Sequence, residues 1–180
     1  MKIISFPAPI FISKFRQHNY FKQSLLDLID QQDSHRVQYG DTNYGESIFK
    51  TDWHINLKTD FQENKNYFDL IYNDILFHVK EILEKSELHK VNISNVWFQQ
   101  YLQNDYHGFH THEKTTWNCV YYLEFGKGTP GTTFKNFFDD TLFTPEVEEG
   151  DIIIFPSFIR HTSLPNESTS RKTIIALNVE

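Results

Sequence analysis

Two stretches in the first half of the chain have the apolar spacing of helices. In residues 19–31 and 64–85, apolar side chains recur every three or four positions, with charged and amide residues between them. The second stretch has the longer series, which consists of Phe68, Ile71, Ile75, Val79 and Ile82. This period places the apolar side chains on one side of a helix. We therefore predict two amphipathic helices that support a sheet.

The pattern changes after residue 90, where short runs rich in β-branched and aromatic residues follow one another. We predict strands over residues 91–103, 116–125, 132–138, 143–147, 150–155 and 171–179. Clusters of glycine, proline and aspartate separate these runs, for example at residues 126–131 and 149–151. Short strands at regular spacing are typical of a sandwich or a barrel.

The N-terminal half also contains candidate strands. Residues 3–12 are apolar but contain two prolines, which suits an edge strand because proline cannot donate to a sheet ladder. Residues 33–46 are polar, contain two glycines and are predicted to be a loop, and residues 47–57 are a further candidate strand. Helices first and most strands later predict the α+β class. With no repeat and no linker, we expect a single domain over residues 1–180.

Composition narrows the class of protein. The chain has 180 residues, 39% of them hydrophobic, which is enough for a globular core. Its net charge of −7 and scattered basic residues make a nucleic-acid partner unexpected. The single cysteine, Cys119, excludes an internal disulfide and a cysteine metal cluster. Because we find no signal peptide and no apolar run of membrane length, we expect a soluble, cytoplasmic protein without a membrane partner.

The candidate chemistry lies in residues 106–122, where two histidines precede an aromatic run. His110 and His112 are two positions apart, so on a strand both imidazoles point to one face. Neutral imidazole is the commonest metal ligand, but a lone His-x-His pair is more often a surface feature. A third histidine, His161, follows a predicted buried strand. Asp52 and His54 have the same spacing, but nothing nearby completes a site with them.

A cationic residue opens the last predicted strand. Arg171 lies ten positions after His161, and Thr173 shares its strand face. An arginine in an apolar barrel needs an anionic partner, and its planar fork suits a carboxylate. The alternative is an ordinary salt bridge at a strand end.

In this order, the pieces resemble a known family. They are Gly108-x-His110-x-His112, Asn118 to Leu123, Gly131 to Phe134, Glu149 to Pro156, His161 and Arg171-x-Thr173. The chain from about 91 to 179 resembles the Fe(II)- and 2-oxoglutarate-dependent oxygenases, in the branch related to prolyl 4-hydroxylases. The resemblance implies a double-stranded β-helix, a jelly-roll barrel, with residues 1–90 as support.

The same resemblance assigns expected roles. His110 and His161 would bind Fe(II), and Arg171 with Thr173 would bind the distal carboxylate of 2-oxoglutarate. Tyr122 matches a tyrosine that contacts this carboxylate, and Asn118 shares its strand face. Tyr101 lies near the position of a second tyrosine that contacts the cosubstrate.

The third iron ligand departs from the family pattern of two histidines and one carboxylate. The carboxylate position is taken by His112. Glu113 is the alternative, although it is out of phase with His110 on a regular strand and needs a bulge. Asp105 is a more remote choice. Three neutral imidazoles would leave the iron with one more positive charge than the usual ligands do.

The expected function is therefore that of a 2-oxoglutarate-dependent dioxygenase that uses O2 and hydroxylates a small molecule or a peptide, releasing succinate and CO2. Two alternatives remain open at this point. One is a cupin-type three-histidine metal dioxygenase that does not use 2-oxoglutarate. The other is a jelly-roll binding protein without catalysis.

Overall fold

The computed structural model describes residues 8–41, 45–53, 65–84, 91–112 and 114–180. Two antiparallel sheets and two helices make up this part of the chain. The large sheet has the strand order β1 (Phe11–Lys14), β9 (Asp151–Pro156), β6 (Trp117–Phe125), β11 (Lys172–Val179), β4 (Ile93–Tyr101), β3 (Ile48–Thr51) and β2 (His35–Val37). The small sheet has the order β5 (His107–His110), β10 (His161–Ser163), β7 (Thr132–Lys135) and β8 (Leu142–Phe143).

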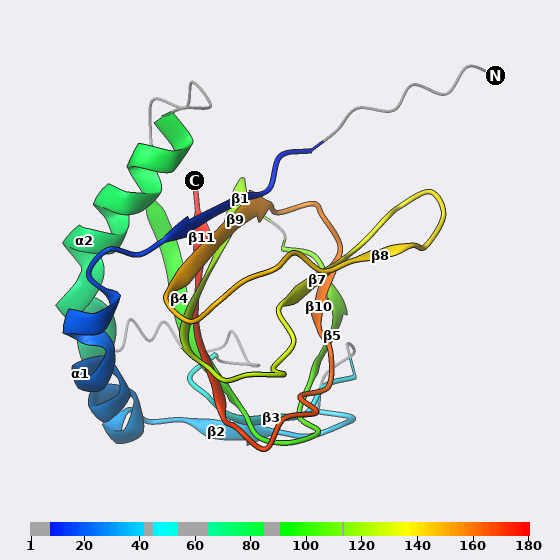
Figure 1. The fold of residues 1–180 in the computed structure, drawn as a ribbon, viewed down its shortest axis with the longest axis horizontal. Helices are drawn as coiled ribbons and strands as arrows, with labels where there is room; N and C mark the ends of the chain where they lie inside the picture. Colours follow the sequence, from blue (N-terminus) through cyan, green and yellow to red (C-terminus); the bar gives the residue numbers. More distant parts are fainter. Residues whose placement is uncertain (1–7, 42–44, 54–64, 85–90, 113) are drawn as a thin grey trace.

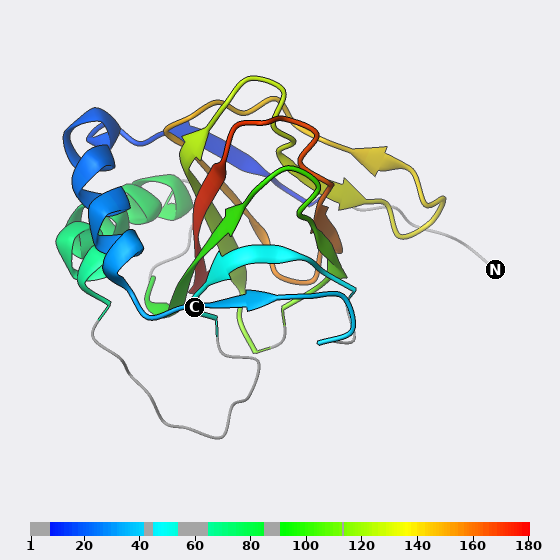
Figure 2. The same ribbon diagram turned by 90° about the horizontal axis from the view of Figure 1, so that it is seen from below.

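The large sheet is covered on both faces. The helices α1 (His18–Gln31) and α2 (Asn66–Leu83) lie on one face, and the small sheet lies on the other (Figure 1). Seen from below, the two helices pack side by side, and the hairpin of β7 and β8 extends away from the body (Figure 2).

Each face of the large sheet contributes to its own apolar core. On β6, Cys119, Tyr121 and Leu123 pack towards the helices, whereas Val120 and Tyr122 belong to the core between the sheets. This assignment follows from the period of two along a strand. Because both cores are buried, the face to which a residue points decides whether it can reach the space between the sheets.

Both predicted helices are confirmed with small changes at their ends, since α1 starts at His18 and α2 spans Asn66–Leu83. The core strands β4, β6, β9 and β11 are also confirmed within the predicted runs or one residue beyond them. The predicted edge strand is shifted to Phe11–Lys14, and among the described residues it pairs only with β9. Residues 1–7 lie outside the described part.

Several short elements differ from the prediction. The predicted loop 33–46 contains β2, whose Val37 is fully buried although three residues are too few to show a period. The strand predicted at 132–138 ends at Lys135, and the run 143–147 contributes only the last residue of β8. The strand β10 was not predicted, and part of the predicted strand 47–57 lies outside the described residues. No helix of the described residues is long and apolar enough to cross a membrane.

A buried carboxylate joins three elements on the helix side. Asp52, at the end of β3, accepts hydrogen bonds from the Tyr67 hydroxyl and the Phe98 amide, each at 2.8 Å. The Lys65 ammonium lies 2.8 Å from the same carboxylate. Asp52 therefore has a structural role here, and it is not part of the histidine group described below. His54 lies outside the described residues.

We predict that Asp52→Ala lowers the free energy of unfolding by about 3 kcal/mol, because it leaves a half-buried ammonium and a buried amide without their partner. Urea unfolding followed by circular dichroism measures this change. The exposed Asp33→Ala is the control and is expected to change stability by less than about 0.5 kcal/mol. A loss below about 1 kcal/mol in Asp52→Ala would contradict this role.

Candidate active site

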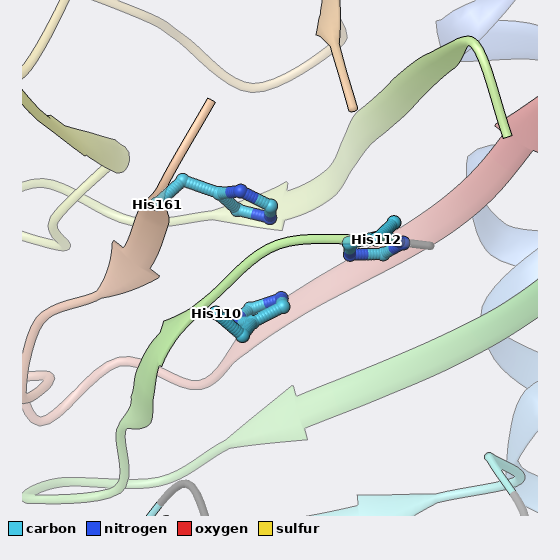
Figure 3. Close-up of side chains that lie close together, drawn as sticks. All are labelled: His110, His112 and His161. Carbon is cyan, nitrogen blue, oxygen red and sulfur yellow. The ribbon is translucent and has the colours of Figure 1, made fainter. Parts of the chain in front are cut away.

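Three histidines meet between the two sheets. His110 ends β5, His112 lies two residues further on, and His161 begins β10, where it pairs with His110 across the antiparallel strands. One ring nitrogen of each histidine lies within 4.8 Å of those of the other two. Figure 3 shows the three imidazoles gathered in one space from these separate segments. The predicted group His110, His112 and His161 is therefore brought together by the fold.

Hydrogen bonds fix which nitrogen of each ring is available. Nδ1 of His110 and Nδ1 of His161 lie 2.8 and 2.9 Å from the carbonyl oxygen two residues earlier in the chain. Nδ1 of His112 lies 2.8 Å from Oδ1 of Asn178 on β11. An oxygen of this kind only accepts, so each Nδ1 carries the proton and each Nε2 keeps its lone pair. This arrangement is typical of metal-binding histidines.

Burial keeps these imidazoles neutral. It lowers the pKa of His161 to about 3 and lowers the pKa of His110 well below its ordinary value, and the neighbouring histidines add to both effects. Burial also lowers the pKa of His112. Because a metal ion competes with protons for an imidazole, neutral rings at physiological pH favour metal binding.

The histidines line a cavity whose other walls come from the large sheet. Alternate residues of β4 and β11 face it, namely Trp97, Gln99, Tyr101, Lys172, Ile174 and Ala176. The Trp97 ring stacks on the His112 ring, with centroids 5.6 Å apart. The cavity therefore combines a candidate metal site with apolar walls and one cationic side chain.

That cationic side chain is Lys172, which is only 1% exposed. Its ammonium donates hydrogen bonds to the Pro130 carbonyl at 2.7 Å and to the Ser163 hydroxyl at 2.9 Å. It also lies 5.2 Å from the centre of the Tyr101 ring. Burial lowers the pKa of Lys172 to about 7. An ammonium has three donors, and within the described part of the chain two of them have acceptors. A bound anion would satisfy the third and favour the charged form.

The structure does not bring Arg171 and Thr173 to this cavity. Arg171 Nε donates to Glu124 at 2.7 Å, and its side chain is 30% exposed. The hydroxyl of Thr173 donates to the same carboxylate at 2.8 Å. The predicted shared face of the two residues is correct, but it is the face towards α1, where Asp30 lies 3.7 Å from Arg171. Lys172, between them, points to the opposite face.

The remaining predicted cosubstrate residues lie at or near the cavity. Tyr101 lines it and donates its hydroxyl proton to Gln99 at 2.7 Å. Tyr122 is fully buried behind the wall, and its hydroxyl lies 2.8 Å from that of Thr132, which lines the cavity. Asn118 lines the cavity, and neither atom of its buried amide has a hydrogen-bond partner within the described residues. Such an amide is available to a ligand.

The carboxylates considered as the third ligand are placed differently. Asp105 is buried and accepts hydrogen bonds from the Leu102 amide at 2.9 Å and the Ser47 hydroxyl at 2.7 Å, and Arg36 lies 3.2 Å from it. It is not part of the histidine group. Glu113 lies outside the described residues.

The sequence reasoning missed two residues of the site. Asn178, which orients His112, lies near the end of a mostly apolar strand and outside every motif described above. The sequence motif assigns the carboxylate-binding role to Arg171 and not to Lys172. The signal for Lys172 is that a residue adjacent to Arg171 must point to the other face of the strand.

No family model and no curated protein sequence matches this chain. Several solved structures are similar to it in fold. A 2OG-Fe(II) oxygenase family oxidoreductase from Burkholderia pseudomallei is similar with a TM-score of 0.67 and 11% identity, over 88% of this chain and 78% of that chain. A prolyl-4-hydroxylase from Pseudomonas putida is similar with a TM-score of 0.60 and 13% identity, over 96% and 94% of the two chains.

A third similar structure is the non-heme alpha ketoglutarate dependent epimerase SnoN from nogalamycin biosynthesis, with a TM-score of 0.68 and 8% identity, over 96% of this chain and 78% of that chain. At such low identities the likeness concerns the fold and leaves the reaction open, and these structures include both a prolyl-4-hydroxylase and an epimerase. This chain has the fold that is found in the 2OG-Fe(II) oxygenases.

Proposed function

We propose that this protein is an Fe(II)- and 2-oxoglutarate-dependent dioxygenase that hydroxylates a substrate not identified by its sequence. In this proposal, residues 1–180 form one domain with a double-stranded β-helix at its core. The observation that carries the proposal is that one buried cavity contains both three convergent histidines and a buried lysine. The fold shared with the 2OG-Fe(II) oxygenases supports it.

The residues fit both groups chemically. Three neutral imidazoles whose Nδ1 atoms face acceptors present Nε2 lone pairs, which suit Fe(II), for which imidazole is a common ligand. A dicarboxylate needs a cationic partner in a dry site, and Lys172 supplies it where Arg171 does not reach. The unpartnered amide of Asn118 offers a further donor to an anionic ligand.

In the proposed mechanism, Fe(II), 2-oxoglutarate and O2 together supply the oxidising chemistry, and succinate and CO2 are released. The protein's residues prepare the site for it. His110, His112 and His161 would hold the metal, with their ring orientation fixed by the acceptors at Nδ1. Lys172 would bind the distal carboxylate and so orient the cosubstrate along the cavity. Ile174 and Ala176 of β11, which line the cavity, would exclude water from the cosubstrate.

A second function is favoured by one observation. Within the described residues the metal-binding group contains histidines only, as in cupin-type dioxygenases that do not use 2-oxoglutarate. The buried Lys172 favours the first proposal, because such enzymes need no anchor for a second carboxylate. A binding protein without catalysis would keep the metal but convert no 2-oxoglutarate.

We predict that His110→Gln, His112→Gln and His161→Gln each weaken Fe(II) binding by more than about 100-fold. Losing a ligand should cost at least as much as losing an outer partner, which typically costs about 10- to 100-fold. Anaerobic titration with Fe(II) measures the affinity. His78→Gln is the control, because His78 is as buried as His161 but lies on α2. If Glu113→Gln weakens binding and His112→Gln does not, the third ligand is Glu113.

We predict that Lys172→Met raises the dissociation constant for 2-oxoglutarate by about 100-fold, because a charge-assisted hydrogen bond in a buried site is lost. The neighbouring Arg171→Met should change it less than about threefold. The visible charge-transfer band of the anaerobic Fe(II) complex reports binding, and succinate formation reports turnover. A larger effect of Arg171→Met than of Lys172→Met would show that Arg171 binds the distal carboxylate.

The pKa of Lys172 sets a further expectation. Because its pKa is about 7 in the free protein, the ammonium that binds the carboxylate is lost as the pH rises. The dissociation constant for 2-oxoglutarate should then rise from pH 7 to pH 9 by up to about tenfold per pH unit. In Lys172→Arg the charge persists, and the curve should be flat. An equally steep rise in Lys172→Arg would show that another group titrates.

A further inference from the structure

A fourth histidine lies directly against the candidate metal ligands. The ring of His107, at the start of β5, stacks on the ring of His110 with centroids 4.0 Å apart and an interplanar angle of 20°. His107 is buried and lines the same cavity. Any group that holds the His107 ring in place therefore also restricts the orientation of His110.

A buried carboxylate holds His107. Glu46 is fully buried, and its Oε2 lies 2.6 Å from Nε2 of His107. The backbone keeps the two side by side, because Ser47 and Tyr106 exchange two hydrogen bonds, at 3.0 and 2.8 Å, in an isolated bridge just before β3 and β5. The backbone pairing of these two distant segments thus places Glu46 beside His107.

A chain of hydrogen bonds orients the His107 ring. The Tyr101 hydroxyl donates to Oε1 of Gln99 at 2.7 Å, and Nε2 of the same amide lies 3.4 Å from Nδ1 of His107. Since the amide nitrogen can only donate, Nδ1 of His107 accepts, and the ring proton lies on Nε2, towards Glu46. The Glu46 carboxylate accepts the hydrogen bond from this Nε2 at 2.6 Å.

The Glu46 carboxylate lies one ring away from a candidate metal site that, in the described part of the chain, has no carboxylate of its own. The ligand group found among the described residues contains three neutral imidazoles and no carboxylate, whereas the usual iron site of this kind includes one carboxylate. We propose that Glu46 supplies the compensating negative charge through His107, and that the pair positions His110. The proposal rests on the metal site of the proposed function. Glu46 and His107 act as positioning residues and not as ligands.

A buried acid and imidazole of this kind are not explained by stability alone. Desolvation of a buried charged group typically offsets most of the gain from its partner, and apolar packing of equal volume is often as stable. The position of the pair, against a metal ligand and inside the cavity wall, is what distinguishes it from Asp52. The carboxylate of Asp52 lies on the helix side of the large sheet, bound to Tyr67.

The test is Glu46→Gln in the full chain, with Asp52→Asn as the matched buried control. Anaerobic titration with Fe(II) alone should show affinity reduced by about 10- to 100-fold in Glu46→Gln. The Fe(III)/Fe(II) reduction potential should rise, because removing a negative charge disfavours the more positive ion. Asp52→Asn should change neither quantity, although it lowers stability. Glu46→Asp should recover the potential in part.

Each other outcome has a definite meaning. A folded Glu46→Gln protein with unchanged Fe(II) affinity and potential would overturn the proposal and leave the pair a structural role. If Glu46→Gln fails to fold, His107→Phe is the second variant. It keeps a ring stacked on His110 and removes the hydrogen bond to Glu46. An unchanged potential in His107→Phe would also overturn it. If only Glu113→Gln raises the potential, the charge comes from Glu113. If the unaltered protein binds no Fe(II), the proposed function itself fails.

Discussion

The burial of both faces of the seven-stranded sheet is the constraint on which the site depends. A strand turns successive side chains to opposite faces, so each residue of β11 belongs either to the helix-side core or to the cavity. Lys172 and Arg171 are neighbours, yet one is buried beside Ser163 and the other pairs with Glu124 at the protein surface. The face to which each residue of β11 points thus decides that Lys172, and not Arg171, can reach a ligand in the cavity.

The same burial gives the cavity its chemistry. Desolvation lowers the pKa of His110, His112, His161 and Lys172, so the cavity holds neutral imidazoles and an ammonium whose charge depends on its partner. In such a dry site a carboxylate interacts with an ammonium far more strongly than in water. The Glu46 carboxylate lies 2.6 Å from His107, whose ring stacks on that of His110. The cavity thus brings neutral imidazoles and one buried ammonium together between the two sheets.

Much of this arrangement was predictable from the sequence because it is periodic or local. The two helices are predicted by apolar side chains at helical spacing. The meeting of the His110 and His112 rings is predicted by their spacing of two residues beside a strand. The phase of β11 was not predictable, because Ile174, Ile175, Ala176 and Leu177 are apolar on both faces. The contact of Glu46 with His107 depends on the meeting of two distant segments, and β10 is too short to show a period.

The most direct test is a crystal structure of the protein with Mn(II) and 2-oxoglutarate, grown without oxygen. Our prediction is a metal ion bound by Nε2 of His110, His112 and His161, with the distal carboxylate of 2-oxoglutarate at the Lys172 ammonium. A metal bound elsewhere, or a carboxylate held by Arg171 on the helix side, would contradict it. So would a cavity that contains the metal and excludes 2-oxoglutarate at saturating concentration.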